Sequence, residues 1–556
     1  MSEAAAASRD RALLAAEPWV ANGGEHLQRL IAELLVLRAS GHLSDPQRRY
    51  PRWELPNAEL RDLLEAGVGG VILLGGSAAE VALRTRELQA WAGRPLLLCA
   101  DVEEGVGQRF EGASWLVPPL ALGRLHRRQG ARALALAERY GRCTGRDARA
   151  AGLNWVLAPV CDVNNNPANP VINVRAWAED AATAGALAAA FNRGLQAEGV
   201  LGCAKHFPGH GDTASDSHLE LPVLPHSRAR LEQVELPPFR SLIEAGVAAV
   251  MTAHLSLPAL DPHRPATLSP AVLNGLLRRH LGFAGLVVTD ALVMEAIAAR
   301  YGAGEAAVMA LEAGADLVLM PADARVAIAA IAAAVASGRL HRGQLEASAA
   351  RRRAALAGLP ERGLTQPDPL TAASPDRDLE LELVTATLEA RGQVRLATAP
   401  ATGVNLIRVD QALQAPFLPA SAPALTVPAA AGLRPCLLAG DTIAPWSGDS
   451  QAPLDLQRLD GGPVLLQLFV RGNPFRGRLQ GQEPWPAAVC QLLAAGRLAG
   501  LVVYGSPYLW DQLRQLLPAE LPAAHSPAQM PLAQQAVLAA LGLVTPERAE
   551  AAGFTD

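Results

Sequence analysis

Short apolar segments alternate with longer amphipathic ones from about residue 27 to residue 357, and this rhythm restricts the folds open to the chain. Residues 68–74 and 285–290 are apolar runs with the length and composition of buried strands. Residues 78–92 and 180–198 have the apolar spacing of helices. Strands that alternate with helices predict a parallel sheet with helices packed outside it.

Seven or eight such units fit an α/β fold of the (β/α)8 TIM-barrel type, with a doubly wound open sheet as the alternative. The other expected strands are 95–101, 155–162, 199–204, 248–254 and 316–320, and residues 30–37 form a largely apolar run. The other expected helices are 60–66, 128–151, 228–245, 270–281, 304–313, 324–336 and 343–357.

Composition divides the chain into four parts. Residues 1–24 are rich in alanine and predict a flexible N-terminal segment, and residues 25–357 predict the barrel. Proline and polar residues interrupt the rhythm over 358–380, as in a linker. Residues 381–556 predict a smaller α/β sandwich domain with strands at 403–409, 464–470 and 501–504. Its ionisable residues form no compact group, so packing or assembly is its expected role.

The charge balance narrows the choice of partners and compartment. The 49 Lys and Arg against 54 Asp and Glu leave a net charge of −5 without a long charged run, which disfavours nucleic acid and anionic membranes. The six scattered cysteines include no Cys-x-x-Cys pair and predict free thiols. The first residues lack the basic start of a signal peptide, and no apolar window is long enough to cross a membrane. We therefore expect a cytoplasmic protein.

The stretch 205–218 concentrates ionisable residues on a loop directly after an expected strand. It reads Lys-His-Phe-Pro-Gly-His-Gly-Asp-Thr-Ala-Ser-Asp-Ser-His. Other ionisable residues end expected strands in the same way, namely Asp101, Asp162, His254 and Asp290. In a (β/α)8 barrel the active site lies at the carboxyl ends of the strands, so these residues are candidates for chemistry.

Each candidate also has a simpler interpretation. Two spacings on the loop, His-x3-His and Asp-x-His, are compatible with a metal site formed by His206, His210, Asp212, Asp216 and His218. Alternatively, His210 and Asp212 shape the loop. Asp290 could cap the following helix. Asp162 and His254 are expected to be structural or to support catalytic groups.

The loop resembles the sequence signature of glycoside hydrolase family 3, in its β-N-acetylhexosaminidase branch. Further segments of that family occur in the same order, namely Asp101…Gln108-Arg109-Phe110, Ala158-Pro159-Val160…Asp162-Val163, Asn169-Pro170-Val171-Ile172…Arg175, Met251-Thr252-Ala253-His254 and Val288-Thr289-Asp290-Ala291-Leu292…Met294. The resemblance covers about residues 25–357 and extends more faintly to the second domain.

The resemblance implies roles for eight residues. Asp290 would be the catalytic nucleophile, and Asp216 with His218 would transfer the proton. The residues that would hold the sugar in the −1 subsite are Asp101, Arg109, Arg175, Lys205 and His206. The implied reaction uses a small carbohydrate substrate and neither a metal nor an organic cofactor.

The chemistry suits these residue types. Retaining hydrolysis needs a carboxylate on one face of the anomeric carbon and a proton donor on the other. The ordinary pKa of histidine, near ~6.5, lies close to working pH. Asp216 could fix the tautomer of His218 through a hydrogen bond. We therefore expect an exo-β-N-acetylglucosaminidase that forms a covalent glycosyl-Asp290 intermediate, with peptidoglycan fragments as the expected substrate by resemblance.

Two departures from the family pattern concern the edge of the substrate site. Glu104 stands where glycine is usual, and Asn173-Val174 stand where Gly-Asp is common. Three other functions stay open. A phosphorylase could use the same dyad, because a neutral histidine repels phosphate less than a glutamate does. A β-glucosidase or β-xylosidase of the family usually takes its acid from the second domain. The third is a sugar-binding protein that has lost activity. The sequence predicts no oligomeric state.

Overall fold

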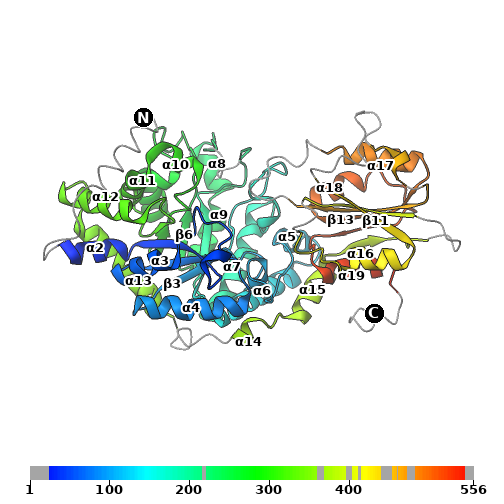
Figure 1. Ribbon diagram of the computed structural model, residues 1–556. Coiled ribbons are helices and arrows are strands. Elements are labelled where there is room, and N and C mark those ends of the chain that lie inside the picture. Colours follow the sequence, from blue (N-terminus) through cyan, green and yellow to red (C-terminus); the bar gives the residue numbers. More distant parts are fainter. Residues whose placement is uncertain are drawn as a thin grey trace. The chain divides into compact units, whose positions relative to one another are not determined.

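The computed structural model describes residues 24–215, 221–359, 369–395, 403–410, 415–439, 454–459, 461–471 and 483–544. The chain divides into two compact units, Met1–Asp376 and Arg377–Asp556, each with its own sheets and hydrophobic core (Figure 1). None of the helices in the described ranges combines the length and the apolar character needed to cross a bilayer.

The described part of the first unit contains eight short strands in two parallel sheets. They are β1 (Leu35–Ser40), β2 (Gly70–Leu74), β3 (Leu97–Ala100), β4 (Trp155–Val156), β5 (Cys203–Phe207), β6 (Ala249–Thr252), β7 (Leu286–Val288) and β8 (Val318–Leu319). One sheet has the order β4-β3-β2-β1-β8 and the other β5-β6-β7. Isolated parallel bridges pair Trp155 with Leu201, Val160 with Lys205, and Val288 with Leu317. The parallel α/β architecture expected from the alternation is confirmed.

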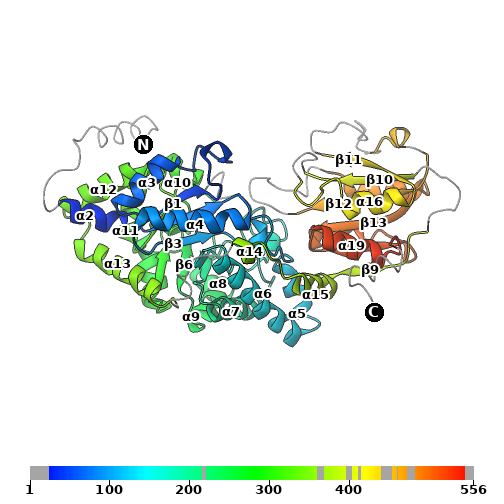
Figure 2. The ribbon, with the colours of Figure 1, turned by 60° about the horizontal axis from the view of Figure 1, so that its bottom comes forward.

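Helices surround these strands in both ribbon views (Figures 1 and 2). They are α2 (Gly24–Ala32), α3 (Asn57–Ala66), α4 (Ala78–Ala92), α5 (Leu120–His126), α6 (Gly130–Ala150), α7 (Ala181–Ala197), α8 (Arg228–Gln233), α9 (Pro237–Glu244), the π-helix η5 (Ala271–His280), α10 (Glu295–Tyr301), α11 (Ala303–Ala313), α12 (Ala324–Ala336), α13 (Arg342–Ala357) and α14 (Pro369–Ala372). Local signals set several ends. Ser77 and Asp180 accept amide hydrogen bonds at the starts of α4 and α7, and Gly93 ends α4 in the left-handed conformation.

Two expected elements differ from the structure at proline residues. The expected helix 228–245 is divided into α8 and α9, because Pro237 begins a new helix and cannot donate the amide hydrogen bond that continuity would need. The expected strand 155–162 has strand geometry only at Trp155–Val156, and Pro159 lies in the extended stretch that follows. Helix α14 and part of α15 (Arg377–Thr387) lie in the stretch that the sequence predicts as a linker.

All eight strands of the first unit, or residues directly beside them, contribute to one buried apolar cluster. Its members include Val36, Ile72, Leu97, Cys99, Trp155, Cys203, Ala249, Met251, Leu286, Val288, Leu317 and Leu319. Because side chains alternate along a strand, residues two positions beyond a member of this cluster start towards the same side. This rule places several charged residues beside the cluster at the carboxyl ends of the strands.

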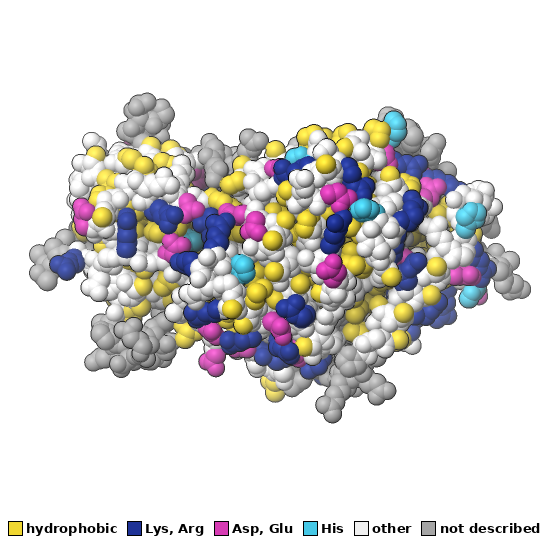
Figure 3. Space-filling view, turned by 180° about the vertical axis from the view of Figure 1, so that it is seen from behind, with side chains coloured by type: hydrophobic (Ala, Val, Ile, Leu, Met, Phe, Trp, Pro, Cys, Tyr) yellow, Lys and Arg dark blue, Asp and Glu magenta, His cyan; other side chains and the backbone are white. Residues whose placement is uncertain are grey.

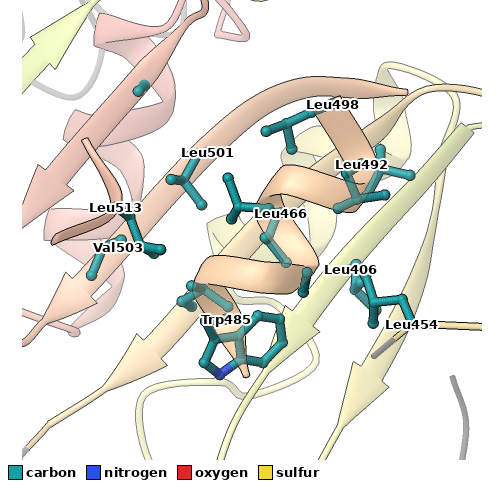
Figure 4. Close-up of a cluster of buried hydrophobic side chains, with 14 of the residues drawn as sticks. Leu406, Leu454, Leu466, Trp485, Leu492, Leu498, Leu501, Val503 and Leu513 are labelled. Carbon is teal, nitrogen blue, oxygen red and sulfur yellow. The ribbon is translucent and has the colours of Figure 1, made fainter. Parts of the chain in front are cut away.

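The second unit contains a six-stranded sheet with apolar side chains on both faces. The strands are β9 (Glu389–Arg391), β10 (Gly403–Arg408), β11 (Leu433–Leu438), β12 (Val464–Val470), β13 (Leu498–Gly505) and β14 (Ala523–Ser526), in the order β11-β10-β12-β13-β14-β9. Only the pairing of β9 with β14 is antiparallel. Figure 4 shows one face, where Leu466 and Leu501 pack against Trp485 and Leu492 of α17 (Trp485–Ala494).

The opposite face of this sheet packs against α16 (Pro423–Ala430) and α19 (Pro531–Ala540). Ile407, Leu465 and Val502 belong to this second cluster, while their neighbours in sequence, Leu406 and Leu466, face the first. A strand that is buried on both faces reads as a continuous apolar run, which is why the sequence predicts 403–409 and 464–470 so closely.

The surface carries charges of both signs. In Figure 3, Lys and Arg side chains are interspersed with Asp and Glu over the face shown, and no patch of one sign covers it. This distribution agrees with the small net charge of −5.

Candidate active site

Three residues predicted to act on the substrate start from the same side of the buried cluster. Asp101, Lys205 and Asp290 stand two positions beyond Cys99, Cys203 and Val288, which all belong to the buried cluster. Burial raises the pKa of the Cys203 thiol, with the Lys205 cation opposing the rise and the carboxylates of Asp101 and Asp290 adding to it. The contact within this set is the ion pair of Lys205 with Asp101, and Asp290 starts from the same side of the buried cluster.

Lys205 is buried between two carboxylates. Its Nζ donates to Asp101 Oδ1 at 2.7 Å and lies 2.7 Å from Glu103 Oε1. Burial alone would lower the pKa of Lys205, but the two carboxylates outweigh burial and raise it. Lys205 is therefore a fixed cation. Asp101 keeps more than a third of its side chain exposed, at 36%.

Glu103 links Lys205 to Arg175. Arg175 Nε and Nη2 each donate to the Glu103 carboxylate at 2.7 Å, and Arg175 Nη1 donates to the Val171 carbonyl at 3.0 Å. Burial disfavours the charged carboxylate, but Arg175 and Lys205 hold the pKa of Glu103 well below its ordinary value. The sequence assigns Arg175 to the sugar and gives Glu103 no role. The structure shows that the Glu103 carboxylate accepts hydrogen bonds from two nitrogens of the Arg175 guanidinium.

His206 is oriented by the buried carboxylate of Asp162. The distance from His206 Nδ1 to Asp162 Oδ2 is 2.7 Å, and the backbone amides of His206 and His210 also donate to Asp162, at 3.2 and 2.6 Å. Burial opposes ionisation of Asp162, but the two histidines lower its pKa. A charged Asp162 accepts from Nδ1–H and leaves Nε2 of His206 for another partner. Asp162 thus orients His206, which is the kind of supporting contact that the sequence predicts for it.

The start of the loop after β5 is held by buried side chains. Asn169 Nδ2 donates to the carbonyls of His210 and Gly211 at 2.9 and 2.8 Å. His210 Nδ1 lies 2.7 Å from the Thr213 hydroxyl oxygen. Burial lowers the pKa of His210 to about 4, so its imidazole is neutral near pH 7. These contacts fix the backbone that leads to the predicted proton-transfer residues.

A contact joins Asp212, which precedes the predicted dyad in sequence, to His226, which follows it. His226 Nε2 lies 2.9 Å from Asp212 Oδ2, and Arg230 Nη2 lies 3.6 Å from the same oxygen. The predicted dyad, Asp216 and His218, lies between them in sequence and falls outside the described residues.

Asp290 lies in the turn after β7. Its Oδ1 accepts a hydrogen bond from the Ala291 amide at 2.8 Å. The simpler interpretation, a cap on the following helix, does not apply, because α10 begins at Glu295 with Met294 as its capping residue. His254 Nε2 lies 3.0 Å from the Ala291 carbonyl oxygen, and since a carbonyl only accepts, this nitrogen carries the proton. His254 thereby connects the segment after β6 to the turn that carries Asp290.

The two departures from the family pattern have local explanations. Glu104 is buried, and its Oε2 accepts from Trp115 Nε1 at 3.1 Å. Asn173 has a φ of 44°, a left-handed conformation that asparagine tolerates better than most residues. Its amide Nδ2 donates to the carbonyls of Pro167 and Asn169 at 3.2 and 3.3 Å. Asparagine is therefore compatible with the left-handed conformation of this position.

Arg109 lies at the exposed side of this group, where its Nε donates to the Asp101 carbonyl at 2.9 Å. Arg38 of β1, which the sequence does not predict as a site residue, stands two positions beyond Val36 of the buried cluster. Burial lowers the pKa of Arg38, and Arg109 adds to this effect, while Glu54 and Asp101 oppose it. Over the described residues, no group of three or more His, Cys, Asp and Glu side chains is arranged to hold a metal ion.

Comparisons with known proteins identify the family of the chain. Residues 27–354 match the Glycosyl hydrolase family 3 N terminal domain, and residues 397–542 match the Bacterial Glycosyl hydrolase family 3 C-terminal domain. Beta-hexosaminidase A of Pseudoalteromonas piscicida is 35% identical over 325 residues, which cover 53% of this chain and 54% of that protein. Beta-hexosaminidase of Stenotrophomonas maltophilia strain K279a is 38% identical over 268 residues, which cover 47% of this chain and 79% of that protein. The chain thus spans about half the length of the first relative.

A solved structure extends the likeness over nearly the whole chain. The glycoside hydrolase family 3 beta-N-acetylglucosaminidase from Paenibacillus sp. str. FPU-7 is 30% identical, with a TM-score of 0.74, and the match covers 93% of this chain and 97% of that one. The resemblance drawn from the sequence is confirmed, and the chain belongs to glycoside hydrolase family 3.

Proposed function

We propose that this chain is a retaining exo-β-N-acetylglucosaminidase that hydrolyses terminal β-linked GlcNAc. The observation that carries the proposal is the ion pair of Lys205 with Asp101 at the carboxyl ends of the strands, on the same side of the buried cluster from which Asp290 starts. A carboxylate beside a fixed cation and a second carboxylate is a suitable arrangement for binding hydroxyl groups and attacking an anomeric carbon. The names of the relatives, β-hexosaminidases and a β-N-acetylglucosaminidase, support the choice of sugar.

In the proposed reaction, Asp290 attacks the anomeric carbon and forms a glycosyl ester, while the glycosidic oxygen leaves. His218, oriented by Asp216, protonates that oxygen and later removes a proton from the water that cleaves the ester. These assignments to His218 and Asp216 rest on the sequence resemblance. The described part of the loop supports them through its anchors on both sides, at Asn169 and His226.

Sugar hydroxyls would be held by Asp101, Lys205, Arg109 and the free nitrogen of His206. Arg175 would act mainly through Glu103, since its Nε and Nη2 already donate to that carboxylate. A buried ion pair holds its members in one geometry, so Glu103 would keep Lys205 aligned with Asp101.

We also infer that the eight strands close into one barrel. The support is the single buried cluster to which all strands contribute, together with the bridges that pair Trp155 with Leu201 and Val288 with Leu317 across the gaps between the two sheets. Peptidoglycan fragments as substrate and a cytoplasmic location stay proposals that rest on the sequence.

The test is the initial rate on an aryl β-N-acetylglucosaminide and on the matching aryl β-glucoside, each with and without inorganic phosphate. The proposal expects a strong preference for the N-acetyl sugar and no dependence on phosphate. Phosphate-dependent turnover with a sugar 1-phosphate product would assign the same residues to a phosphorylase. Equal rates on the two sugars would reject the choice of substrate.

A further inference from the structure

The turn that follows β3 carries side chains that the proposed function assigns to the sugar or to its supports. We call this segment, residues 101–116, the β3 turn. Asp101 and Glu103 contact Lys205, and Arg109 donates to the Asp101 carbonyl. Groups that bind a substrate act efficiently only when a surrounding layer of contacts holds them in one geometry. The contacts that hold the β3 turn from outside are therefore part of the site.

Hydrogen bonds inside the β3 turn connect Ser114 to Glu103. The Ser114 carbonyl accepts from the Gly107 amide at 2.8 Å. The next residue, Gln108, accepts from the Glu103 amide at 2.8 Å through its side-chain oxygen. Gly107 has no room for a side chain, because a Cβ there would collide with the Ala113 carbonyl. The position of Ser114 therefore influences the backbone that carries Glu103.

Ser114 is fully buried and is held by two further parts of the chain. Its amide donates to Asp147 Oδ2 of α6 at 3.2 Å, and its hydroxyl oxygen accepts from the Asp376 amide at 2.9 Å. Arg146, the neighbour of Asp147 on α6, donates through Nη1 and Nη2 to Asp376 Oδ2 at 3.3 and 3.2 Å. Asp376 thus contacts the β3 turn through its backbone and α6 through its side chain.

Asp376 belongs to the segment that the sequence predicts as a linker, and it is the last residue of the first unit. The described part of this segment, residues 369–376, packs on that unit. Helix α14 lies against α4 and α6, and Ala372 is buried. A Cβ placed on Gly112 of the β3 turn would lie 3.6 Å from Ala373 Cβ. A flexible linker stays solvated, so these contacts assign the segment to the packed structure of the first unit.

We propose that residues 369–376 are a positioning element of the catalytic unit, which holds the β3 turn in its substrate-binding geometry through Asp376. The inference rests on the proposed function, because it assigns the purpose of the contact to sugar binding by Asp101. The path of contacts runs from Asp376 through Ser114 to the backbone of Glu103. Loss of the Asp376 side chain should leave the fold intact, since 27% of that side chain is exposed, and should loosen the β3 turn.

The experiment uses the full chain and two variants that each break the same ion pair, Asp376→Ala and Arg146→Gln. Each should lower kcat/KM on an aryl β-N-acetylglucosaminide about fivefold, the largest loss typical of a partly exposed pair. The double variant should lose no more than the larger single loss, because both substitutions remove one contact. Asp376→Glu keeps the carboxylate and should recover part of the rate. Melting temperatures identify variants that fail to fold.

Arg142→Gln is the matched control. Arg142 lies one turn earlier on α6, is 48% exposed against 44% for Arg146, and pairs with Glu138 and Glu198. The control should keep the kcat/KM of wild type. The same loss in Arg142→Gln, or additive losses in the double variant, would overturn the inference.

Hydrogen exchange of peptides from residues 101–116 gives a readout that does not depend on activity. Asp376→Ala should exchange faster than wild type in the β3 turn and equally in peptides from β5 and β7. Unchanged exchange in the β3 turn, or faster exchange throughout the first unit, would overturn the inference. Wild-type inactivity on aryl β-N-acetylglucosaminides would instead reject the proposed function, while the exchange still decides whether Asp376 holds the β3 turn.

Discussion

Glu103 shows how single residues shape this site. Its carboxylate accepts from Arg175 and lies against Lys205, with all three side chains largely buried. Removing one member of a buried ion network leaves an uncompensated charge, which costs far more than the loss of a surface pair. The network therefore acts as one unit, and the loss of its central carboxylate should affect both stability and activity.

Glu103→Gln should lower the free energy of unfolding by about 3 kcal/mol or more, because two buried cations lose their shared anion. The same variant should lower kcat/KM, since Lys205 loses one of its two anchors. Chemical denaturation and steady-state rates measure the two effects. Glu104→Gln is the control, because an amide can still accept from Trp115 Nε1. Equal losses in the two variants would contradict a special role for Glu103.

His210 gives the protein a pH-dependent stability. Its pKa is about 4 in the folded chain against 6.5 in the unfolded chain, so between these values only the unfolded state binds the proton. Stability should therefore be complete above about pH 6.5 and fall as pH drops towards 4, by about 3 kcal/mol at most. Urea denaturation at pH 7.5 and pH 5.0 measures the fall. His210→Asn should show a smaller difference between the two pH values, and an unchanged difference would exclude His210 as the cause.

Side chains such as Glu103 and Arg38 show what sequence alone could not predict. Each stands an even number of residues beyond a strand residue of the buried cluster, namely Cys99 and Val36. This spacing along a strand indicates from sequence which side of the sheet a side chain starts towards. Their partners, however, are far away in sequence, as in the contacts from Glu103 to Arg175 and Lys205. Only the folded arrangement reveals which charges are paired.

At the scale of elements, the turn after β7 depends on the segment after β6. His254 donates to the carbonyl of Ala291, and the Ala291 amide donates to Asp290. Thr267 lies 2.9 Å from the other ring nitrogen of His254 and fixes the ring. His254 is thus a positioning residue for the proposed nucleophile.

His254→Ala should lower kcat about tenfold or more, with KM changed by less than about threefold, because a displaced nucleophile slows attack more than it weakens binding. His254→Gln retains a side-chain donor and should recover part of kcat. His263→Gln, on an exposed histidine of the same segment, is the control. A rise in KM with unchanged kcat would show that His254 acts on binding instead.

The periodic elements are the ones that the sequence predicts best. The expected helices 78–92 and 324–336 and the expected strand 464–470 coincide with α4, α12 and β12. Their apolar spacing is set by burial, which local sequence records directly. Strand 155–162 is wrong in extent because its polar and proline residues belong to the site region, where tertiary contacts decide the backbone.

At the scale of the whole molecule, each compact unit has its own core, and the second sheet is buried on both faces. Leu466 is fully buried in that sheet. Leu466→Ala should destabilise the second unit by about 2–5 kcal/mol through lost contacts and a cavity. Hydrogen exchange of peptides from β12 and β13 measures the loss. Leu516→Ala, at an exposed position, should have little effect, and similar exchange in the two variants would contradict this account of the core.

The central claim is that Asp290 forms a covalent bond with the sugar. The most direct measurement is to trap that species with a 5-fluoro β-N-acetylglucosaminyl fluoride, which slows hydrolysis of the ester, and to map the modified peptide by mass spectrometry. The account predicts one added sugar on the peptide that contains Asp290, and none in Asp290→Asn. A label on a different residue, or no label together with a product of inverted anomeric configuration, would contradict it.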